Sequence, residues 1–301
     1  IFGWIARMMK ILLFGKSGQL GWELKRTLAP LGEVIALEYP DVDFTKPLSL
    51  VDVIDTVEPD LIINAVAYTA VDSAETHQHI AQLINCDSVA VLAQQAARMQ
   101  IPFIHYSTDY VYDGSKGSPY IETDQPNPLN VYGVSKLRGD EAVLESSGAG
   151  VILRTSWVYS LRQAGFVSKV LSWVRQQEVL RIVEDQISGP TSSRMLAEAS
   201  ALMVARAGGL VYDYFKERAG VYHLAGEGAC SRYEWARAII ALDPHKNEHK
   251  VREIIPAKSV EFPTLATRPL VSVLNCDKFA DVFGLRMPPW EVGLGMMLEE
   301  G

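Results

Sequence analysis

Short apolar runs alternate with longer amphipathic stretches along the first half of the chain. The apolar runs cover residues 10–15, 33–38, 61–66, 102–108 and 151–157, and the amphipathic stretches lie near 20–30, 72–99 and 131–146. Short segments that are apolar on both faces indicate strands of a parallel sheet that is covered by helices on both sides. The pattern therefore predicts an α/β fold with a doubly wound parallel sheet.

The second half of the chain has a less regular pattern. We expect helices near 192–206, 231–242 and 289–300, whereas 244–270 is rich in Pro, Lys and Glu and indicates loops with short elements. No low-complexity linker separates the two halves. We therefore expect a Rossmann-like dinucleotide-binding domain over 9–157, to which strands near 181–185 and 221–226 return, and a smaller C-terminal lobe that binds the substrate over 158–301.

The composition argues against several classes of protein. The 301 residues are 48% hydrophobic, ample for a buried core, and the net charge of −8 without a basic run argues against nucleic-acid binding. No apolar run reaches the roughly 20 residues that span a bilayer. The opening IFGWIARM is too short for a secretory leader, so we expect the natural start at Met8 or Met9. Cys86, Cys230 and Cys276 form no metal-binding motif and are expected to be reduced thiols in the cytoplasm.

A glycine-rich turn, GKSGQLG, joins the first predicted strand to the first predicted helix. Gly15 permits a tight turn, Gly18 lets the backbone approach a pyrophosphate, and Gly21 lets helix and strand pack closely. The helix N-terminus offers free N–H groups to the phosphates. The turn predicts a dinucleotide site made of Gly15, Lys16, Ser17, Gly18, Gln19, Leu20 and Gly21.

Two charged residues near this turn give opposite indications about the cofactor. Glu38 ends the second predicted strand, where an acid binds a ribose 2′-hydroxyl and favours NADH. Lys16 is placed to attract a 2′-phosphate instead, which favours NADPH. Asp43 and Phe44 follow the same strand and are candidates to border the adenine. The cofactor is therefore expected to be NADPH or NADH.

The ends of the next strands carry the other candidate residues, because ligands bind at the carboxyl edge of an open parallel sheet. Small side chains at this edge let a dinucleotide lie against the backbone, and hydroxyl groups there can bind a substrate. The third strand is followed by Ala65, Ala67 and Tyr68, with Asn85 in the next helix; the fourth ends with Ser107, Thr108 and Asp109, and the fifth with Arg154, Ser156 and Trp157.

Tyr132 and Lys136 begin the helix that follows the fourth strand, and their spacing puts them on one helix face. A nearby ammonium lowers the pKa of a phenol, so Tyr132 can donate a proton while hydride reaches a carbonyl carbon, and Thr108 can hydrogen-bond the carbonyl oxygen. Tyr212 and Lys216 have the same spacing without a comparable hydroxyl nearby and are expected to be a surface or packing pair.

Several stretches together resemble the dTDP-4-dehydrorhamnose reductase family, an extended branch of the short-chain dehydrogenases. They are GKSGQLGWEL, NAVAYTAVDSAE, STDYVYDG, YGVSK, RTSWVYS and DQISGPT. The resemblance implies dTDP-rhamnose biosynthesis for cell-surface polysaccharide, by reduction of the C4 keto group of a nucleotide sugar. It also implies a catalytic set of Thr108, Tyr132 and Lys136, cofactor contacts from Tyr132 and Lys136, and substrate contacts from Thr108, Asp109, Tyr110, Tyr132 and Trp157.

Other activities of similar proteins remain open at this point. Nucleotide-sugar 4,6-dehydratases typically carry Thr-Asp-Glu at the fourth strand end, where this chain has Thr108-Asp109-Tyr110, so keto reduction fits better than elimination. An epimerase or another nucleotide-sugar reductase is an alternative. A non-catalytic role, like that of the regulatory subunit of methionine adenosyltransferase, is a further one, although the intact catalytic set argues against it.

Some members of this family are dimers bridged by a magnesium ion that glutamates hold. Glu23 and Glu300 match two of those glutamates, but Arg194 stands where the third is expected, and a cation repels Mg²⁺. We therefore predict no metal, with Glu23 and Glu300 as the candidates if one binds. Arg194 either pairs with one of them in a metal-free homodimer or is solvated, and a monomer is the alternative to the dimer. Arg268, in TRPL, is a candidate contact for the substrate diphosphate.

Overall fold

A parallel sheet forms the centre of the computed structural model, which describes residues 8–299. The strand order is β10-β5-β4-β3-β1-β2, so the order along the sheet reverses between β1 and β3. Ligands bind at such a reversal, at the carboxyl ends of the strands. The six strands are β1 (Met9–Phe14), β2 (Gly32–Leu37), β3 (Leu61–Asn64), β4 (Phe103–Thr108), β5 (Gly150–Thr155) and β10 (Gly220–His223).

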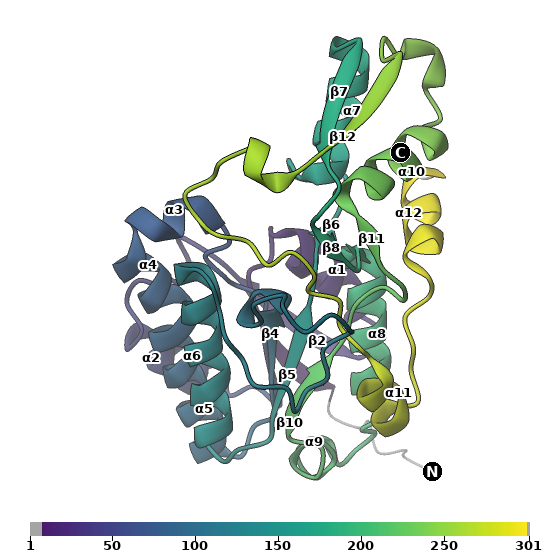
Figure 1. Cartoon of the computed structure of the whole chain (residues 1–301). Coiled ribbons are helices and arrows are strands. Elements are labelled where there is room, and N and C mark those ends of the chain that lie inside the picture. The colour runs from purple at the N-terminus through teal and green to yellow at the C-terminus, as the bar shows by residue number, and fades with distance from the viewer. Residues whose placement is uncertain (1–7, 300–301) are drawn as a thin grey trace, which may run out of the picture.

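Helices cover both faces of this sheet, as the apolar pattern predicts (Figure 1). In β1, Ile11 and Leu13 pack toward one face and Leu12 and Phe14 toward the other, because successive side chains of a strand alternate. The first face carries α1 (Gln19–Thr27), α8 (Ser193–Ala205), α9 (Val211–Lys216) and α11 (Asp277–Phe283). The second carries α2 (Ser49–Val57), α5 (Ser88–Met99) and α6 (Val131–Glu145).

The link between β3 and α5 consists of three short helical segments. It contains α3 (Val71–Thr76), α4 (Gln78–Gln82) and the π-helical turn η1 (Leu83–Asp87). π-helical turns are rare and are often found at functional sites. Here the turn places Asn85, which is fully buried, against the first turns of α6.

A smaller lobe stands beyond the carboxyl edge of the sheet, at the top of Figure 1. Its core lies between helices α7 (Phe166–Gln176), α10 (Arg232–Leu242) and α12 (Trp290–Glu299) and the strand β7 (Val179–Val183). Two short strand pairs join the lobe to the domain below. They are β6 (Val158–Tyr159) with β9 (Thr191–Ser192), and β8 (Ile187–Ser188) with β11 (Cys230–Ser231).

One sequence expectation about the sheet is wrong and another is confirmed. The strand expected near 181–185 is β7, and it pairs with β12 (Glu253–Ala257) in a separate two-stranded sheet instead of returning to the central one. The strand expected near 221–226 does return, as β10 beside β5. The second half of the chain also supplies α8 and α11 to the sheet's first face, so its residues contribute to both parts of the molecule.

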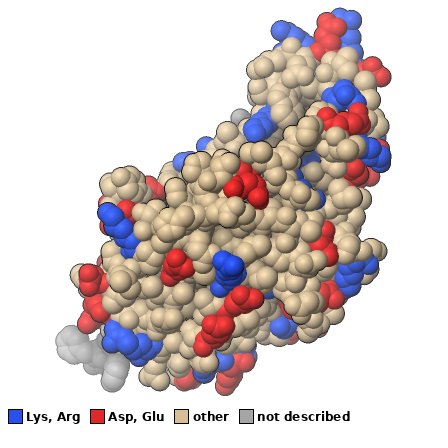
Figure 2. Space-filling view, turned by 60° about the vertical axis from the view of Figure 1, so that its left-hand side comes forward, with Lys and Arg blue, Asp and Glu red and all other residues tan. Residues whose placement is uncertain are grey.

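The remaining features concern the surface and the cysteines. Lys, Arg, Asp and Glu side chains are interspersed on the face seen in Figure 2. Within residues 8–299, no helix has both the length and the apolar character that a membrane crossing requires. Cys230 is buried, Cys86 and Cys276 are half-buried, and all three are free thiols. Short 3-10 turns lie at Asp109–Val111, Lys246–Glu248 and Ser259–Glu261.

Candidate active site

The glycine turn lies at the carboxyl end of β1 and has the backbone that its sequence predicts. Gly15 has a φ of +92°, which favours glycine, and a Cβ at Gly21 would lie 1.8 Å from the Gly15 carbonyl oxygen. Gly21 therefore allows α1 to begin directly against the turn. The Ser17 backbone N–H donates to Glu38 Oε2 at 2.9 Å, so the acid at the end of β2 is bound to the turn itself.

A hollow of about 590 Å³ adjoins the turn on the side of Glu38. Its walls carry four cationic side chains and one carboxylate, from Lys16, Lys25, Arg26, Arg162 and Glu38. The guanidinium carbons of Arg26 and Arg162 lie 3.4 and 3.1 Å from the ring centre of Trp22, which also lines the hollow. The Lys16 ammonium bonds Asp41 at 2.6 Å, which raises its pKa. The excess of positive charge suits a ligand that carries a further phosphate.

Asn85 holds the backbone after β3 close to α6. Its Oδ1 accepts from the Tyr68 backbone N–H at 2.8 Å, and its Nδ2 donates to the Tyr68 carbonyl at 3.2 Å and to Ser135 Oγ at 3.0 Å. The side chain of Asn85 is therefore fully engaged within the protein. It positions the stretch that contains Ala65, Ala67 and Tyr68.

The end of β4 forms a tight polar turn. Thr108 Oγ1 accepts from the Tyr110 backbone N–H at 3.1 Å and donates to Asp109 Oδ1 at 3.2 Å. Asp109 Oδ2 accepts from the hydroxyls of Ser188 and Ser272. Burial raises the pKa of Asp109 to about 6, although these hydrogen bonds and the charge of Arg232 act in the opposite direction. The Asp109 carboxylate thus points into the protein and supports Thr108.

Tyr132 lies in the first turn of α6, which Asn130 caps by accepting from the Gly133 N–H at 2.8 Å. The Tyr132 ring packs edge-on against Tyr110, with ring centres 5.7 Å apart. Burial raises the pKa of Tyr132, and a hydrogen bond with Thr108 opposes that shift. The structure thus brings the predicted phenol and hydroxyl together.

Lys136 is buried one turn further along α6 and bonds β4. Its Nζ donates to the Tyr106 carbonyl at 2.7 Å and lies 3.0 Å from His105 Nε2. Burial lowers the pKa of Lys136 to about 8, and the charge of Asp140 opposes this. The sequence analysis expected Lys136 to leave Tyr132 with a lowered pKa, and this expectation is wrong. The pKa of the phenol is raised, and burial is the main cause.

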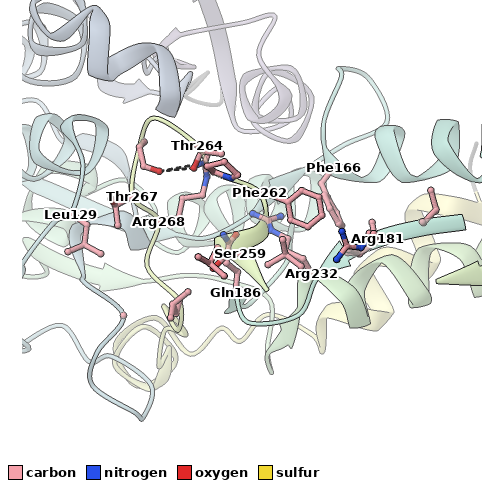
Figure 3. Close-up of a pocket in the computed structure, with 18 of the residues that line it drawn as sticks. Leu129, Phe166, Arg181, Gln186, Arg232, Ser259, Phe262, Thr264, Thr267 and Arg268 are labelled. Atoms are coloured by element: carbon pink, nitrogen blue, oxygen red, sulfur yellow. Dashed lines mark hydrogen bonds between the residues drawn. The ribbon is translucent and has the colours of Figure 1, made fainter. Parts of the chain in front are cut away.

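A cavity of about 1240 Å³ lies between the lobe and the domain (Figure 3). Three arginines line it: Arg181 from β7, Arg232 from the start of α10, and Arg268 from the loop after β12. Arg268 also interacts with the Tyr110 phenol, so the cavity adjoins the turn after β4. Its lobe end combines the rings of Phe166 and Phe262 with Arg181.

Asp72 and a layer of aromatic rings hold two of these arginines. Arg268 Nη2 lies 2.6 Å from Asp72 Oδ2, and Arg232 stacks over Trp157 with its guanidinium carbon 3.5 Å from the ring centre. Burial lowers the pKa of Arg232 to about 10. Trp157, which has a φ of +41°, in turn stacks on Trp235.

Several candidates from the strand ends have structural contacts instead. Arg154 Nε pairs with Asp140 at 2.9 Å in the interior, and Ser156 Oγ donates to the Gly189 carbonyl at 2.6 Å. Lys216, the last residue of α9, bonds the Ser147 carbonyl that follows α6, away from the end of β4. Sequence reasoning missed Arg232, because it belongs to no motif, and missed Asp72, whose partner lies 196 positions away.

The residues considered for a metal line a separate hollow of about 580 Å³. Glu23 and Arg194 are both part of its wall, and Arg194 Nε bonds Glu198 Oε1 at 3.1 Å on α8. Glu300 lies outside the described residues. Within 8–299, no group of three or more His, Cys, Asp or Glu side chains is arranged to hold a metal ion.

Comparisons with known proteins agree along the whole length. Residues 9–301 match the family model described as the RmlD substrate binding domain. A dTDP-4-dehydrorhamnose reductase of Burkholderia thailandensis is 39% identical, over 97% of this chain and 99% of the relative. A solved dTDP-4-dehydrorhamnose reductase from Clostridium acetobutylicum has a TM-score of 0.88 at 31% identity, with 97% and 99% coverage. One from Bacillus anthracis, solved in complex with NADP, has a TM-score of 0.86 at 29% identity and the same coverage.

Proposed function

This chain belongs to the dTDP-4-dehydrorhamnose reductase family, and we propose that it reduces the C4 keto group of dTDP-4-dehydro-β-L-rhamnose to dTDP-L-rhamnose with NADPH. It is an NAD(P)H-dependent oxidoreductase of dTDP-rhamnose biosynthesis. One observation supports the assignment most directly. The Thr108 hydroxyl and the Tyr132 phenol interact at the carboxyl end of β4, and the neighbouring Tyr110 interacts with Arg268, one of the three arginines that line the cavity.

The catalytic roles follow from the chemistry of these side chains. The nicotinamide supplies the hydride when it is bound. Tyr132 donates its phenolic proton to the substrate oxygen, and Thr108 would turn its hydroxyl proton from Asp109 Oδ1 to the same oxygen. Lys136 carries positive charge one turn from Tyr132 and stabilises the phenolate that this transfer leaves.

The charges around the glycine turn favour NADPH over NADH. A 2′-phosphate would meet Lys16, Arg26 and Arg162 in the adjoining hollow. Glu38, which would favour a ribose hydroxyl, already accepts a hydrogen bond from Ser17. Lys16 and Glu38 give opposite indications in the sequence. The arginines of α1 and of the segment after β6 add positive charge, which favours the cofactor with the 2′-phosphate.

The arginine-lined cavity suits a nucleoside diphosphate sugar. Arg232 and Arg268 would bind the two phosphates, since guanidinium groups match phosphate oxygens in geometry and charge. The aromatic rings of Phe166 and Phe262 at the lobe end would receive the base. The sugar would then extend toward Tyr110 and Tyr132. We propose the lobe as the substrate-binding part and, because the three thiols are free, the cytoplasm as the compartment.

The test is oxidation of NADPH and NADH, followed by loss of the reduced-nicotinamide absorbance, with purified dTDP-4-dehydrorhamnose as substrate. We expect turnover with both cofactors and a preference for NADPH. Tyr132→Phe should remove most turnover and leave cofactor binding intact, because only the transferable proton is lost. Tyr212→Phe is the matched control, since that phenol belongs to the remote pair on α9. No oxidation by the wild-type protein, or full turnover by Tyr132→Phe, would refute the proposal.

A further inference from the structure

A buried polar chain runs beneath the candidate active site from β3 to α6. The Val66 backbone N–H donates to Asn64 Oδ1 at 3.0 Å, and Asn64 Nδ2 lies 3.3 Å from His105 Nδ1. On the other side of the imidazole, His105 Nε2 lies 3.0 Å from Lys136 Nζ. The side chains of Asn64, His105 and Lys136 are all buried. In such a chain every hydrogen bond needs a donor that faces an acceptor.

The backbone at Val66 sets the proton positions along this chain. Its N–H requires the amide oxygen of Asn64, so the amide N–H groups of Asn64 face His105 Nδ1. Nδ1 must then be the acceptor, and a neutral imidazole with a lone pair at Nδ1 carries its proton at Nε2. That Nε2–H points at Lys136 Nζ, which can accept only as the uncharged amine. The amine still donates to the Tyr106 carbonyl.

The ammonium form of Lys136 fits the same chain less well. It would need a lone pair at His105 Nε2, which moves the imidazole proton to Nδ1. There it would face the Asn64 amide, and two donors would meet across 3.3 Å. A doubly protonated imidazole would face a donor at Nδ1 and an ammonium at Nε2, and burial lowers the pKa of His105 well below its usual range.

Asp140, Arg154 and Tyr132 also lie near Lys136 and bear on its charge. Asp140, one turn on along α6, favours the ammonium, but Arg154 from β5 pairs with Asp140 at 2.9 Å. Tyr132, one turn before, is neutral because burial raises its pKa. Burial of Lys136 acts in the same direction as the hydrogen-bond pattern.

We propose that Asn64 and His105 are positioning residues for Lys136 that favour its uncharged amine and so set the alkaline limit of the reduction. The second part rests on the proposed function, in which the charge of Lys136 stabilises the Tyr132 phenolate. Lys136 supports Tyr132 only while it keeps its proton, so activity falls as the pH rises through the titration of this lysine. The side chains of Asn64 and His105 are fully buried and act through the protonation of Lys136.

The sharpest variant is Asn64→Asp, because it keeps the shape of the side chain and reverses one hydrogen bond. A carboxylate accepts both the Val66 N–H and a proton on His105 Nδ1, which leaves the Nε2 lone pair for the ammonium of Lys136. We expect the titration midpoint of Lys136 to rise by about one pH unit, a tenfold change in acidity. The alkaline limb of kcat/KM should move upward with it.

The titration is followed directly by the ¹⁵N shift of Nζ in protein labelled with ¹⁵N-lysine, and Lys136→Met identifies the resonance. This measurement needs no substrate, so an inactive wild-type protein would refute the proposed function without affecting the result for Lys136. An unchanged or lower midpoint in folded Asn64→Asp would overturn the inference.

The new charge of an aspartate at 64 could also act on Lys136 through space, and His105→Gln separates the two effects. On its own, His105→Gln should raise the midpoint, because the amide can turn its oxygen toward the ammonium. With glutamine at 105, adding Asn64→Asp should shift the midpoint by less than half as much as it does beside His105. A full shift in that background would show a purely electrostatic effect and refute the role of the imidazole. If Asn64→Asp does not fold, His105→Gln alone still tests the inference. A titration midpoint of Lys136 that does not rise in His105→Gln contradicts it.

Discussion

The buried carboxylate of Asp109 should make the stability of this protein depend on pH in a specific way. Burial raises the pKa of Asp109 from its usual 3.8 to about 6 in the folded chain. A carboxyl group whose pKa is raised by folding contributes stability that is fully present below the unfolded pKa and is lost as the pH rises through the folded pKa. This stability is therefore lost mainly between about pH 4, the unfolded pKa, and about pH 6, the folded pKa.

The size of the effect follows from the shift. A change of about two pKa units corresponds to about 3 kcal/mol in the free energy of unfolding. Asp109→Asn removes the titration and keeps a side chain of similar shape. The stability of the variant relative to the wild type should therefore increase by about 3 kcal/mol between pH 3 and pH 7. The measurement is urea unfolding of both proteins at several pH values, since the other titrating groups cancel in the difference.

Asp113 provides a control with the opposite sign. Hydrogen bonds from Asn127, Ser115 and Tyr120 lower its pKa, so its contribution is present above the unfolded value of 3.8 and is lost as the pH falls through the folded pKa. The difference between Asp113→Asn and the wild type should thus stay nearly flat between pH 5 and pH 7. A flat difference for Asp109→Asn as well would refute the reasoning from burial.

Two further predictions concern the ligand sites. The double variant Arg26→Gln/Arg162→Gln should lower the preference for NADPH over NADH about tenfold, because two guanidinium groups leave the hollow beside Glu38. Competition by 2′-phospho-AMP should weaken in parallel. The control variant Arg98→Gln, at the far end of α5, should change neither the cofactor preference nor this competition. Asp72→Ala should raise the KM for the nucleotide sugar about tenfold with little change in the KM for NADPH, because it removes the ion-pair partner of Arg268. Asp52→Ala on α2 is the control. An unchanged KM for the sugar would contradict the assignment of Arg268 to the substrate site.

The elements that the sequence predicts well are those with a local signal. The strands of the central sheet are mostly apolar, and the glycine turn and the Tyr132–Lys136 spacing can be recognised within a few residues. Long-range partners have no such signal. Nothing in the short apolar stretch of β7 shows that β12, more than 70 residues later, is its partner instead of the central sheet.

The least predictable features are the directions of long side chains. The spacing puts Lys136 on the face of Tyr132, but its four-carbon stem lets Nζ reach β4, where it contacts His105 and the Tyr106 carbonyl. Arg232 is similar: its sequence neighbours are unremarkable, and only the stacked rings of Trp157 and Trp235 explain why it points at the cavity.

The path of the chain between domain and lobe has a consequence for engineering. After β5 the chain enters the lobe, returns through α8 and β10, enters the lobe again through α10 and β12, and comes back once more through α11 before α12 (Figure 1). Cutting after residue 157 would strip β10 from the edge of the sheet and leave the apolar side of α1 uncovered. A new specificity therefore cannot be transplanted from a relative as one contiguous cassette; it needs several coordinated segments exchanged together.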